Sequence, residues 1–299
     1  MQRRYVTVDV FTAAAFGGNP LAVVLDAEGL GTSQMQSIAA EFNYSETTFL
    51  LPPREKGHAA QVRIFTPRIE IGFAGHPTVG TAVVLARELE ARGESPPEDL
   101  VLEEGVGPVA VRLMRSGGRV TGAEFRAPRA LELGACMSLD DAAACLSLPA
   151  VDLCREIPPR VLSVGLPFLV VAVASRDALR KAKPSLAAHE RVLPALGTDA
   201  VFAYARGDAA EELHARMFSP LDSIAEDPAT GSAAAATLAF LAAARPVRDA
   251  ETSWRVTQGV EMGRPSLILG RTVKRDGVVT AVHLGGQAVA VMRGSLDID

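Results

Sequence analysis

Runs of apolar residues divide this chain into many short strands and a few helices. Residues 5–11, 21–25 and 47–51 are rich in β-branched and aromatic side chains and border Gly, Pro or Asn turns, which is typical of strands. Two Ala-rich segments, 78–89 and 231–244, have helical length and are apolar on nearly every side, so we expect other elements to enclose them. A strongly curved sheet wrapped around one central helix satisfies both signals.

The same pattern predicts the remaining elements. In the first half, we expect a helix at 33–41 and further strands at 59–65, 100–103, 109–114 and 120–125. In the second half, we expect strands at 160–164, 168–173, 200–204, 213–218, 254–257, 266–269, 278–283 and 288–292. Pro246 stops the second central helix, because proline cannot continue it.

Two segments of the chain repeat one another at an offset of 153 residues. RIFTPRIEIGFAGHPTVGTAVVLA begins at Arg63 and ARMFSPLDSIAEDPATGSAAAATLAFL at Ala215, and each reads as a strand, a polar turn and an apolar helix. A Gly-X-Pro turn before them and a glycine turn after them recur in the same order. A period near 150 residues is too long for a solenoid and predicts two similar domains. We place them at 1–128 and 129–299, with the last strand able to pack back on the first half.

Composition narrows the class of partner. The net charge of −5 and an aromatic content of 5% argue against a nucleic-acid surface. The most apolar run, residues 233–244, is too short to span a membrane, and no secretory signal is evident. Three cysteines without a CxxC pair indicate a reduced cytoplasmic protein without a disulfide framework or a zinc site. We therefore expect no nucleic-acid or membrane partner and no metal or other cofactor.

Glu46 is the first candidate for chemistry. A carboxylate between a helix and a strand is usually a solvated loop residue. Here Phe42, Tyr44 and Phe49 are close in sequence, and apolar surroundings would raise the pKa of the carboxyl towards neutrality. Such a group can accept and return a proton.

The turns that open the two apolar helices supply the other candidates. GFAGHPTVGTA places Gly75 and His76 at the first helix start, and EDPATGSAAAA places Asp227, Gly231 and Ser232 at the second. Free backbone N–H groups at a helix start favour an anion. The plainer alternatives are that His76 packs or caps its helix and that Asp227 is an N-cap.

Together these segments resemble the PhzF family of phenazine-biosynthesis-like isomerases, within the diaminopimelate epimerase superfamily. The resemblance extends from VDVFTAAAFGGNPLAVV through AEFNYSETTFL, FTPRIEIGFAGHPTVGTA, DPATGSAA and QGVEMGRPS to GGQAVAVMRGSL. It implies an α+β fold of two pseudo-symmetric halves, each a β-sheet rolled around a central helix, with the active site between them, and a homodimer. It also implies that Glu46 is catalytic, that His76 and Asp227 hold substrate, and that Gly75, Gly231 and Ser232 bind it.

The resulting hypothesis is a cofactor-independent isomerase of a small, anionic, carboxylated cyclic or unsaturated metabolite, with Glu46 moving the proton and His76 and Asp227 assisting. Epimerases of this superfamily carry a cysteine in each helix-opening turn, whereas Cys136, Cys145 and Cys154 lie elsewhere in this chain. A two-thiol mechanism is therefore disfavoured. Two alternatives stay open: an epimerase or lyase of hydroxy- or amino-acids on the same scaffold, and a non-catalytic metabolite-binding protein.

Overall fold

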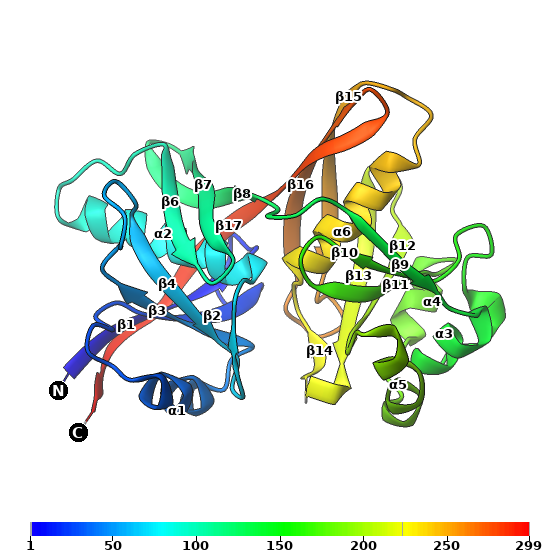
Figure 1. Cartoon of the computed structure of the whole chain (residues 1–299), viewed down its shortest axis with the longest axis horizontal. Helices are drawn as coiled ribbons and strands as arrows, with labels where there is room; N and C mark the ends of the chain where they lie inside the picture. The colour runs from blue at the N-terminus through cyan, green and yellow to red at the C-terminus, as the bar shows by residue number, and fades with distance from the viewer. Residues whose placement is uncertain (1, 223, 299) are drawn as a thin grey trace. The chain divides into compact units, whose positions relative to one another are not determined.

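The chain forms two compact units. The computed structural model describes residues 2–222 and 224–298, so residue 223, within the second repeated segment, lies outside the described part. Unit 1 comprises Met1–Arg126 and Gly285–Asp299, and unit 2 comprises Ala127–Leu284. Figure 1 labels the elements of both units, which are described separately below.

Unit 1 is a closed eight-stranded barrel with one extra short strand. Its strands pair in the order β1, β2, β3, β4, β6, β7, β8 and β17, and β17 pairs with β1 to complete the ring. The elements are β1 (Gln2–Val10), β2 (Asn19–Val24), α1 (Thr32–Phe42), β3 (Glu46–Leu51), β4 (Ala60–Phe65), β5 (Glu70–Ile71), α2 (Gly75–Ala91), β6 (Asp99–Glu104), β7 (Gly107–Ser116), β8 (Arg119–Arg126) and β17 (Val278–Asp297, from Gly285 onward in this unit).

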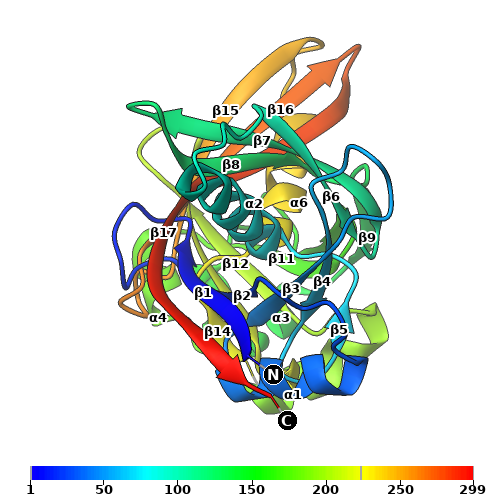
Figure 2. The same ribbon diagram turned by 90° about the vertical axis from the view of Figure 1, so that its left-hand side faces the viewer.

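Helix α2 is enclosed by this barrel, as its apolar composition predicts. It contacts β1, β2, β3, β6, β7 and β8, and Figure 2 shows it surrounded by these strands. The approach to β1 and β2 is close at Gly80, where a Cβ atom would lie 2.8 Å from Val10 Cγ2 and 2.6 Å from Leu21 Cδ2. The absence of a side chain at Gly80 therefore sets the depth at which α2 sits in the barrel.

Unit 2 is a curved sheet with helices on both faces. The strands pair in the order β9, β10, β11, β12, β13, β15 and β16, with β14 added to β13. The elements are β9 (Glu132–Cys136), α3 (Leu139–Cys145), η1 (Ala150–Asp152), β10 (Arg160–Ser163), β11 (Pro167–Ala172), α4 (Arg176–Lys181), α5 (Leu186–Val192), η2 (Pro194–Leu196), β12 (Val201–Arg206), β13 (Glu212–Ser219), η3 (Pro220–Asp222), β14 (Ile224–Asp227), α6 (Gly231–Ala243), β15 (Ala250–Gln258) and β16 (Ser266–Arg275).

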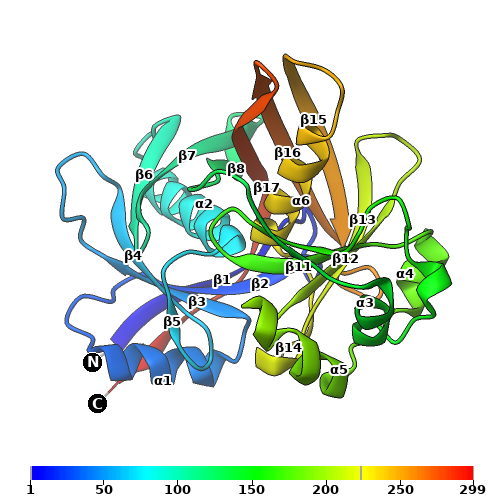
Figure 3. The same ribbon diagram turned by 45° about the vertical axis from the view of Figure 1, so that its right-hand side comes forward.

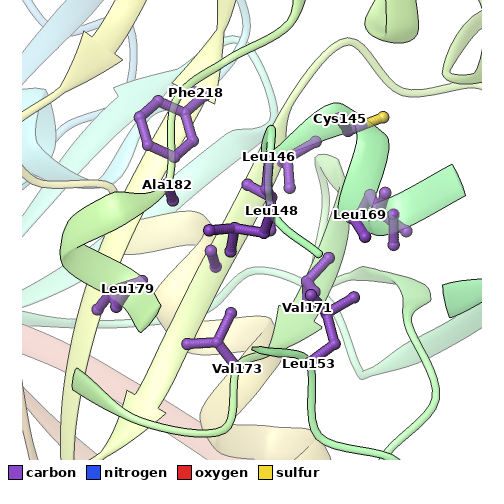
Figure 4. Packing of buried hydrophobic residues seen from close by; sticks show 14 of the residues in the cluster. Cys145, Leu146, Leu148, Leu153, Leu169, Val171, Val173, Leu179, Ala182 and Phe218 are labelled. Atoms are coloured by element: carbon purple, nitrogen blue, oxygen red, sulfur yellow. The ribbon is translucent and has the colours of Figure 1, made fainter. Parts of the chain in front are cut away.

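Helix α6 occupies the inner face of this sheet. It packs against β10, β11, β15 and β16, and nearly all of its residues are buried (Figure 3). The outer face is covered by α3, α4 and α5. Figure 4 shows side chains of this buried cluster, with Leu146, Leu148 and Leu179 from the helical layer and Leu169 and Val171 from β11.

These architectures confirm the expected fold class, an α+β protein built from two rolled sheets, each around one central helix. Both central helices are found, although α2 starts at Gly75, three residues before the predicted Thr78. The earlier start is possible because Pro77 still lies in the first turn, where no backbone N–H is needed. No helix among the described residues is long and apolar enough to cross a membrane.

Two features differ from the sequence-based expectation. Helices α3, α4 and α5 and the short strands β5, β9 and β14 were not predicted, and the two strands predicted at 278–283 and 288–292 are a single strand, β17. The predicted break coincided with Gly285 and Gly286, which are not a turn. They allow a close backbone crossing with β8, where a Cβ atom on Gly285 would lie 2.5 Å from the Ala123 carbonyl oxygen.

Candidate active site

Glu46 is the first residue of β3 and pairs with Leu21 of the parallel strand β2. Side chains of a strand alternate between its faces, so Glu46 and Thr48 share the face that carries α2. Thr48 fixes that contact through a 2.9 Å hydrogen bond to the Thr81 hydroxyl of α2. The Glu46 side chain is 16% exposed, so it is half-buried rather than solvated.

The aromatic residues near Glu46 play a different part from the one expected. Phe49 lies on the opposite face of β3, where it packs edge-on against Phe65 in the cluster beneath α1. Phe42 contacts Tyr5 and Tyr44. The expectation that Phe49 buries Glu46 is therefore wrong, because an odd separation along a strand reverses the side chain.

His76 is the side chain that the structure brings to Glu46. It is the second residue of α2 and is 5% exposed, and its Nε2 atom lies 3.4 Å from Glu46 Oε2. Burial lowers the pKa of His76 to about 3, and a hydrogen bond to the backbone of Pro20 opposes this shift only in part. The imidazole is therefore neutral at physiological pH.

The proton of this neutral ring can be placed from its partners. Proline has no backbone N–H, so the Pro20 carbonyl accepts a hydrogen bond from the ring nitrogen of His76 that faces it. The other nitrogen, Nε2, then carries a lone pair directed at Glu46. A proton on the Glu46 carboxyl can be donated to this lone pair, and the 3.4 Å separation is within the range over which catalytic contacts tighten on substrate binding.

The N-termini of α2 and α6 lack the side-chain caps found elsewhere in the protein. Helices α3, α4 and α5 begin with Ser138, Ser175 and Ser185, whose hydroxyls accept first-turn N–H groups. Within the described residues, the N-cap residues of α2 and α6, Ala74 and Thr230, provide no such bond. Backbone donors and the positive end of the helix dipole are thus left to bind an anion near Gly75 and near Gly231 and Ser232.

In unit 2, Asp227 ends β14 and belongs to a buried polar network. The Thr230 hydroxyl donates to Asp227 Oδ2 at 2.5 Å. The Gln258 amide donates to the Asp227 carbonyl at 2.8 Å and to Thr230 Oγ1 at 3.1 Å, and it accepts the Thr230 N–H at 3.1 Å. These bonds fix the turn between β14 and α6 and hold the Asp227 carboxylate beside the first turn of α6.

The sequence pattern missed four buried polar residues that support these helix starts. Thr78 and Glu104 are hydrogen-bonded to each other in unit 1, and Thr230 and Gln258 in unit 2. One signal could have found two of them. Glu104 and Gln258 each end a strand, each precede a glycine, and they are 154 residues apart, close to the offset of the repeat.

None of the three cysteines lies in a turn that opens α2 or α6. Cys145 is within α3, where burial raises the pKa of its thiol to about 11. Cys136 is exposed on β9, and the Cys154 thiol donates to Glu156 at 3.1 Å. A thiol with a raised pKa is a poor nucleophile and base, which agrees with the sequence-based argument against a two-thiol mechanism.

The structure thus gathers the predicted site residues into two sets. Glu46, Gly75 and His76 lie together in unit 1, and Asp227, Gly231 and Ser232 lie together in unit 2. That both sets serve one substrate stays a prediction. In chemical terms, unit 1 offers a carboxyl that can exchange a proton beside an anion-binding helix start. Unit 2 offers a fixed carboxylate, that of Asp227, beside a second anion-binding helix start.

Comparison with known proteins finds a matching family, related sequences and a similar solved structure. Residues 8–294 match the PhzC-PhzF family model, described as phenazine biosynthesis-like protein. An uncharacterised isomerase of Mesorhizobium japonicum is 40% identical, with 99% of each chain covered. The trans-2,3-dihydro-3-hydroxyanthranilate isomerase of Pseudomonas chlororaphis is 35% identical, with 98% of each chain covered. The crystal structure of a Bacillus anthracis phenazine biosynthesis protein of the PhzF family superposes with a TM-score of 0.88 at 25% identity over all of both chains.

Proposed function

Because this chain belongs to the phenazine biosynthesis-like family and is an isomerase, we propose that it moves a proton between two carbons of a small cyclic carboxylate, with Glu46 as the proton carrier. The observation that carries the proposal is the buried contact of Glu46 with the neutral ring of His76, next to an uncapped helix start. The resemblance predicted from the sequence is confirmed by the family match.

The substrate class follows from the relatives and from the chemistry of the two helix starts. Three relatives at 35% identity are isomerases of trans-2,3-dihydro-3-hydroxyanthranilate, a ring that carries a carboxylate, an amino group and a hydroxyl. In our proposal, backbone N–H groups at Gly75 bind the carboxylate. Asp227 accepts a hydrogen bond from an amino or hydroxyl group, and the N–H groups of Gly231 and Ser232 add anion-binding capacity.

The proposed reaction conserves every atom of the substrate. The ionised Glu46 carboxylate takes a proton from one ring carbon, and the electrons of the broken C–H bond shift into the adjacent double-bond system. The protonated Glu46 then returns the proton to a second carbon, where a new C–H bond forms. No oxidant or reductant is consumed, so the proposal needs no cofactor.

His76 supports this cycle as a neutral partner. Its Nε2 lone pair accepts a hydrogen bond from Glu46 when the carboxyl holds the proton, and it orients the carboxyl towards the substrate. Because the ring is not protonated, it leaves no cation that would trap Glu46 as a permanent carboxylate. This is the physical reason for placing a histidine with a depressed pKa beside a proton carrier.

We further propose a cytoplasmic homodimer. All three cysteines are free, which suits a reducing compartment. Light scattering on the purified protein would then give twice the 31.4 kDa mass of one chain.

The proposal is tested by incubating the protein with trans-2,3-dihydro-3-hydroxyanthranilate and following the product by proton NMR. We expect turnover by the wild type and a decrease in kcat of about 10² to 10⁴ in Glu46→Gln, which keeps the shape of the side chain but cannot accept a proton. Cys136→Ala, on the exposed strand β9, is the control that keeps full activity. Unchanged turnover by Glu46→Gln contradicts the role of the glutamate, and no turnover by the wild type contradicts the substrate.

A further inference from the structure

Glu104 is a buried carboxyl that the proposed reaction does not use. It is the last residue of β6 and is 7% exposed. Its Oε1 atom lies 2.7 Å from the Thr78 hydroxyl in the first turn of α2, two residues after His76. Its Oε2 atom is buried and has no hydrogen-bond partner among the described residues. A buried carboxylate with a single neutral partner costs much more free energy than a neutral carboxylic acid at the same place.

The hydrogen bonds of Thr78 also indicate that Glu104 is protonated. Its hydroxyl lies 2.8 Å from the Ala74 carbonyl oxygen, which can only accept, and 2.7 Å from Glu104. A hydroxyl has one proton. If that proton is donated to Ala74, as is common for threonine in a helix, the second contact needs a proton supplied by Glu104. Burial agrees, because it raises the pKa of Glu104 to about 8.

Unit 2 carries a neutral side chain at the matching place. Gln258 ends β15, precedes Gly259 and bonds the Thr230 hydroxyl at the start of α6, as Glu104 ends β6, precedes Gly105 and bonds the Thr78 hydroxyl. A Cβ atom on either glycine would lie within 2.7 Å of the turn before the helix. A glutamine is the neutral counterpart of a protonated glutamate, with one donor end and one acceptor end.

We propose that Glu104 is a positioning residue that acts in its protonated form, donating a hydrogen bond to Thr78 and thereby fixing the Ala74–Gly75 peptide at the start of α2 for the substrate carboxylate. That a substrate carboxylate binds at this helix start rests on the proposed function. The role of Glu104 in holding the Ala74–Gly75 peptide does not.

The geometry gives two reasons for this arrangement. The Ala74 carbonyl and the Gly75 N–H belong to one planar peptide, so holding the carbonyl along the helix directs the N–H out of the helix start. A negative charge on Glu104 would also oppose the binding of an anion at the positive end of α2. Deprotonation therefore weakens substrate binding without removing a group that reacts.

Four other charged residues, Arg54, Arg63, Glu70 and Glu103, line the same hollow of about 750 Å³ as Glu104. Arg63 forms a two-pronged pair with Glu70, and Glu103 accepts hydrogen bonds from the amides of Arg54 and Glu55 and contacts His58. On α2, His76 is neutral. Among the described residues, Thr78 is the group hydrogen-bonded to Glu104, so we expect it to respond to the charge of Glu104.

The test follows the backbone amide of Gly75 by ¹⁵N NMR in the full-length, unliganded protein. As the pH is raised from about 6.5 to about 9.5, the wild-type resonance should move with a midpoint near the Glu104 pKa of about 8. Glu104→Gln keeps a donor to Thr78 but cannot ionise, so its Gly75 resonance should stay still. The ¹³C shift of the Glu104 carboxyl in the wild type gives the same midpoint without any variant.

Glu103→Gln is the matched control, because it removes the neighbouring carboxylate of β6 and leaves Glu104 in place. Its Gly75 resonance should titrate as in the wild type. A Gly75 resonance that does not move in the wild type, or that still titrates in Glu104→Gln, overturns the inference, as does a carboxyl that is already ionised at pH about 6.5.

The link to the substrate has its own readout. The KM of the wild type for trans-2,3-dihydro-3-hydroxyanthranilate should rise about two- to fivefold above the Glu104 midpoint while kcat holds, and the KM of Glu104→Gln should be flat. If the wild type does not turn over this compound, the proposed function is contradicted while the Gly75 titration still decides the role of Glu104. If turnover occurs and the two KM profiles are the same, the substrate part of this inference is contradicted.

Discussion

Thr230 joins the polar side chains that hold the start of α6. Its hydroxyl donates to Asp227 and accepts from Gln258, so the valine variant removes two buried hydrogen bonds. We expect Thr230→Val to lower the free energy of unfolding by about 1 to 3 kcal/mol. It should also raise KM, because the Asp227 carboxylate loses one of the bonds that hold it. Thermal unfolding and steady-state kinetics measure both effects.

Thr237→Val in the same helix is the matched control for this prediction. The Thr237 hydroxyl is also buried, but it bonds only to the Ala233 carbonyl one turn earlier. We expect little change in KM from this variant. Equal effects of Thr230→Val and Thr237→Val on KM would show that the hydrogen bonds of Thr230 to Asp227 and Gln258 have no special role in substrate binding.

Residue chemistry could be predicted from the sequence only where a motif isolates the residue. His76 and Asp227 stand next to prolines at the start of apolar helices, and Glu46 stands in a short polar segment. Glu104 and Gln258 lie at the ends of strands, where a polar residue is ordinary. Their burial depends on Gly105 and Gly259, which admit the backbone of a distant turn, and no local pattern reports that contact.

At the scale of elements, the position of α2 depends on a glycine. The added methyl group in Gly80→Ala would meet side chains of β1 and β2 at less than 3 Å, so the helix must shift or its neighbours must change conformation. We expect a loss of about 1 to 3 kcal/mol in the free energy of unfolding, measured by chemical denaturation. Because α2 carries His76, turnover should decrease as well.

Gly31→Ala serves as the comparison. Gly31 has a φ of −76°, and the nearest atom to an added Cβ is Gln34 Oε1 at 3.8 Å. Any residue can adopt this backbone, so only a small cost is expected, from the lower preference for alanine at a helix N-cap. If Gly80→Ala lowers the free energy of unfolding by no more than Gly31→Ala does, the close packing at Gly80 does not set the position of α2.

The predictability of the elements follows their length and burial. Helices α2 and α6 are long and apolar on most sides, and both were identified from composition. Helices α3, α4 and α5 have six or seven residues each, too few for a clear helical period. Their apolar residues cover the outer face of the unit 2 sheet, and this packing stabilises them.

At the scale of the whole molecule, the burial of His76 makes stability depend on pH. The folded-state pKa of about 3 lies below the ordinary value of 6.5. Between these values the unfolded chain binds a proton that the folded chain does not, so this residue lowers stability as the pH falls. Relative to His76→Gln, the wild type should lose about 1.4 kcal/mol of unfolding free energy per pH unit in this window.

Denaturant titrations of the wild type and His76→Gln at several pH values measure this difference. Parallel curves for the wild type and His76→Gln between pH about 6.5 and about 4 would show that His76 accepts a proton in the folded state.

The internal repeat was the most informative global signal in the sequence. It predicted the fold class because each copy contains a strand, a turn and an apolar helix that must be enclosed. The repeat alone does not show how residues from Gly285 onward complete the barrel of unit 1, although the last strand is expected to be able to pack back on the first half. That outcome depends on the pairing of β17, at the end of the chain, with β1 and β8, which are distant from it in sequence.

Solvent deuterium tests the central claim, that Glu46 carries the proton, most directly. A carboxyl that holds the substrate proton during turnover exchanges part of it with the solvent. The wild type in ²H₂O should therefore place deuterium at the newly protonated carbon, and Cys136→Ala should do the same. Glu46→Gln should place none. Deuterium in the product of Glu46→Gln at the wild-type level would show that another group moves the proton.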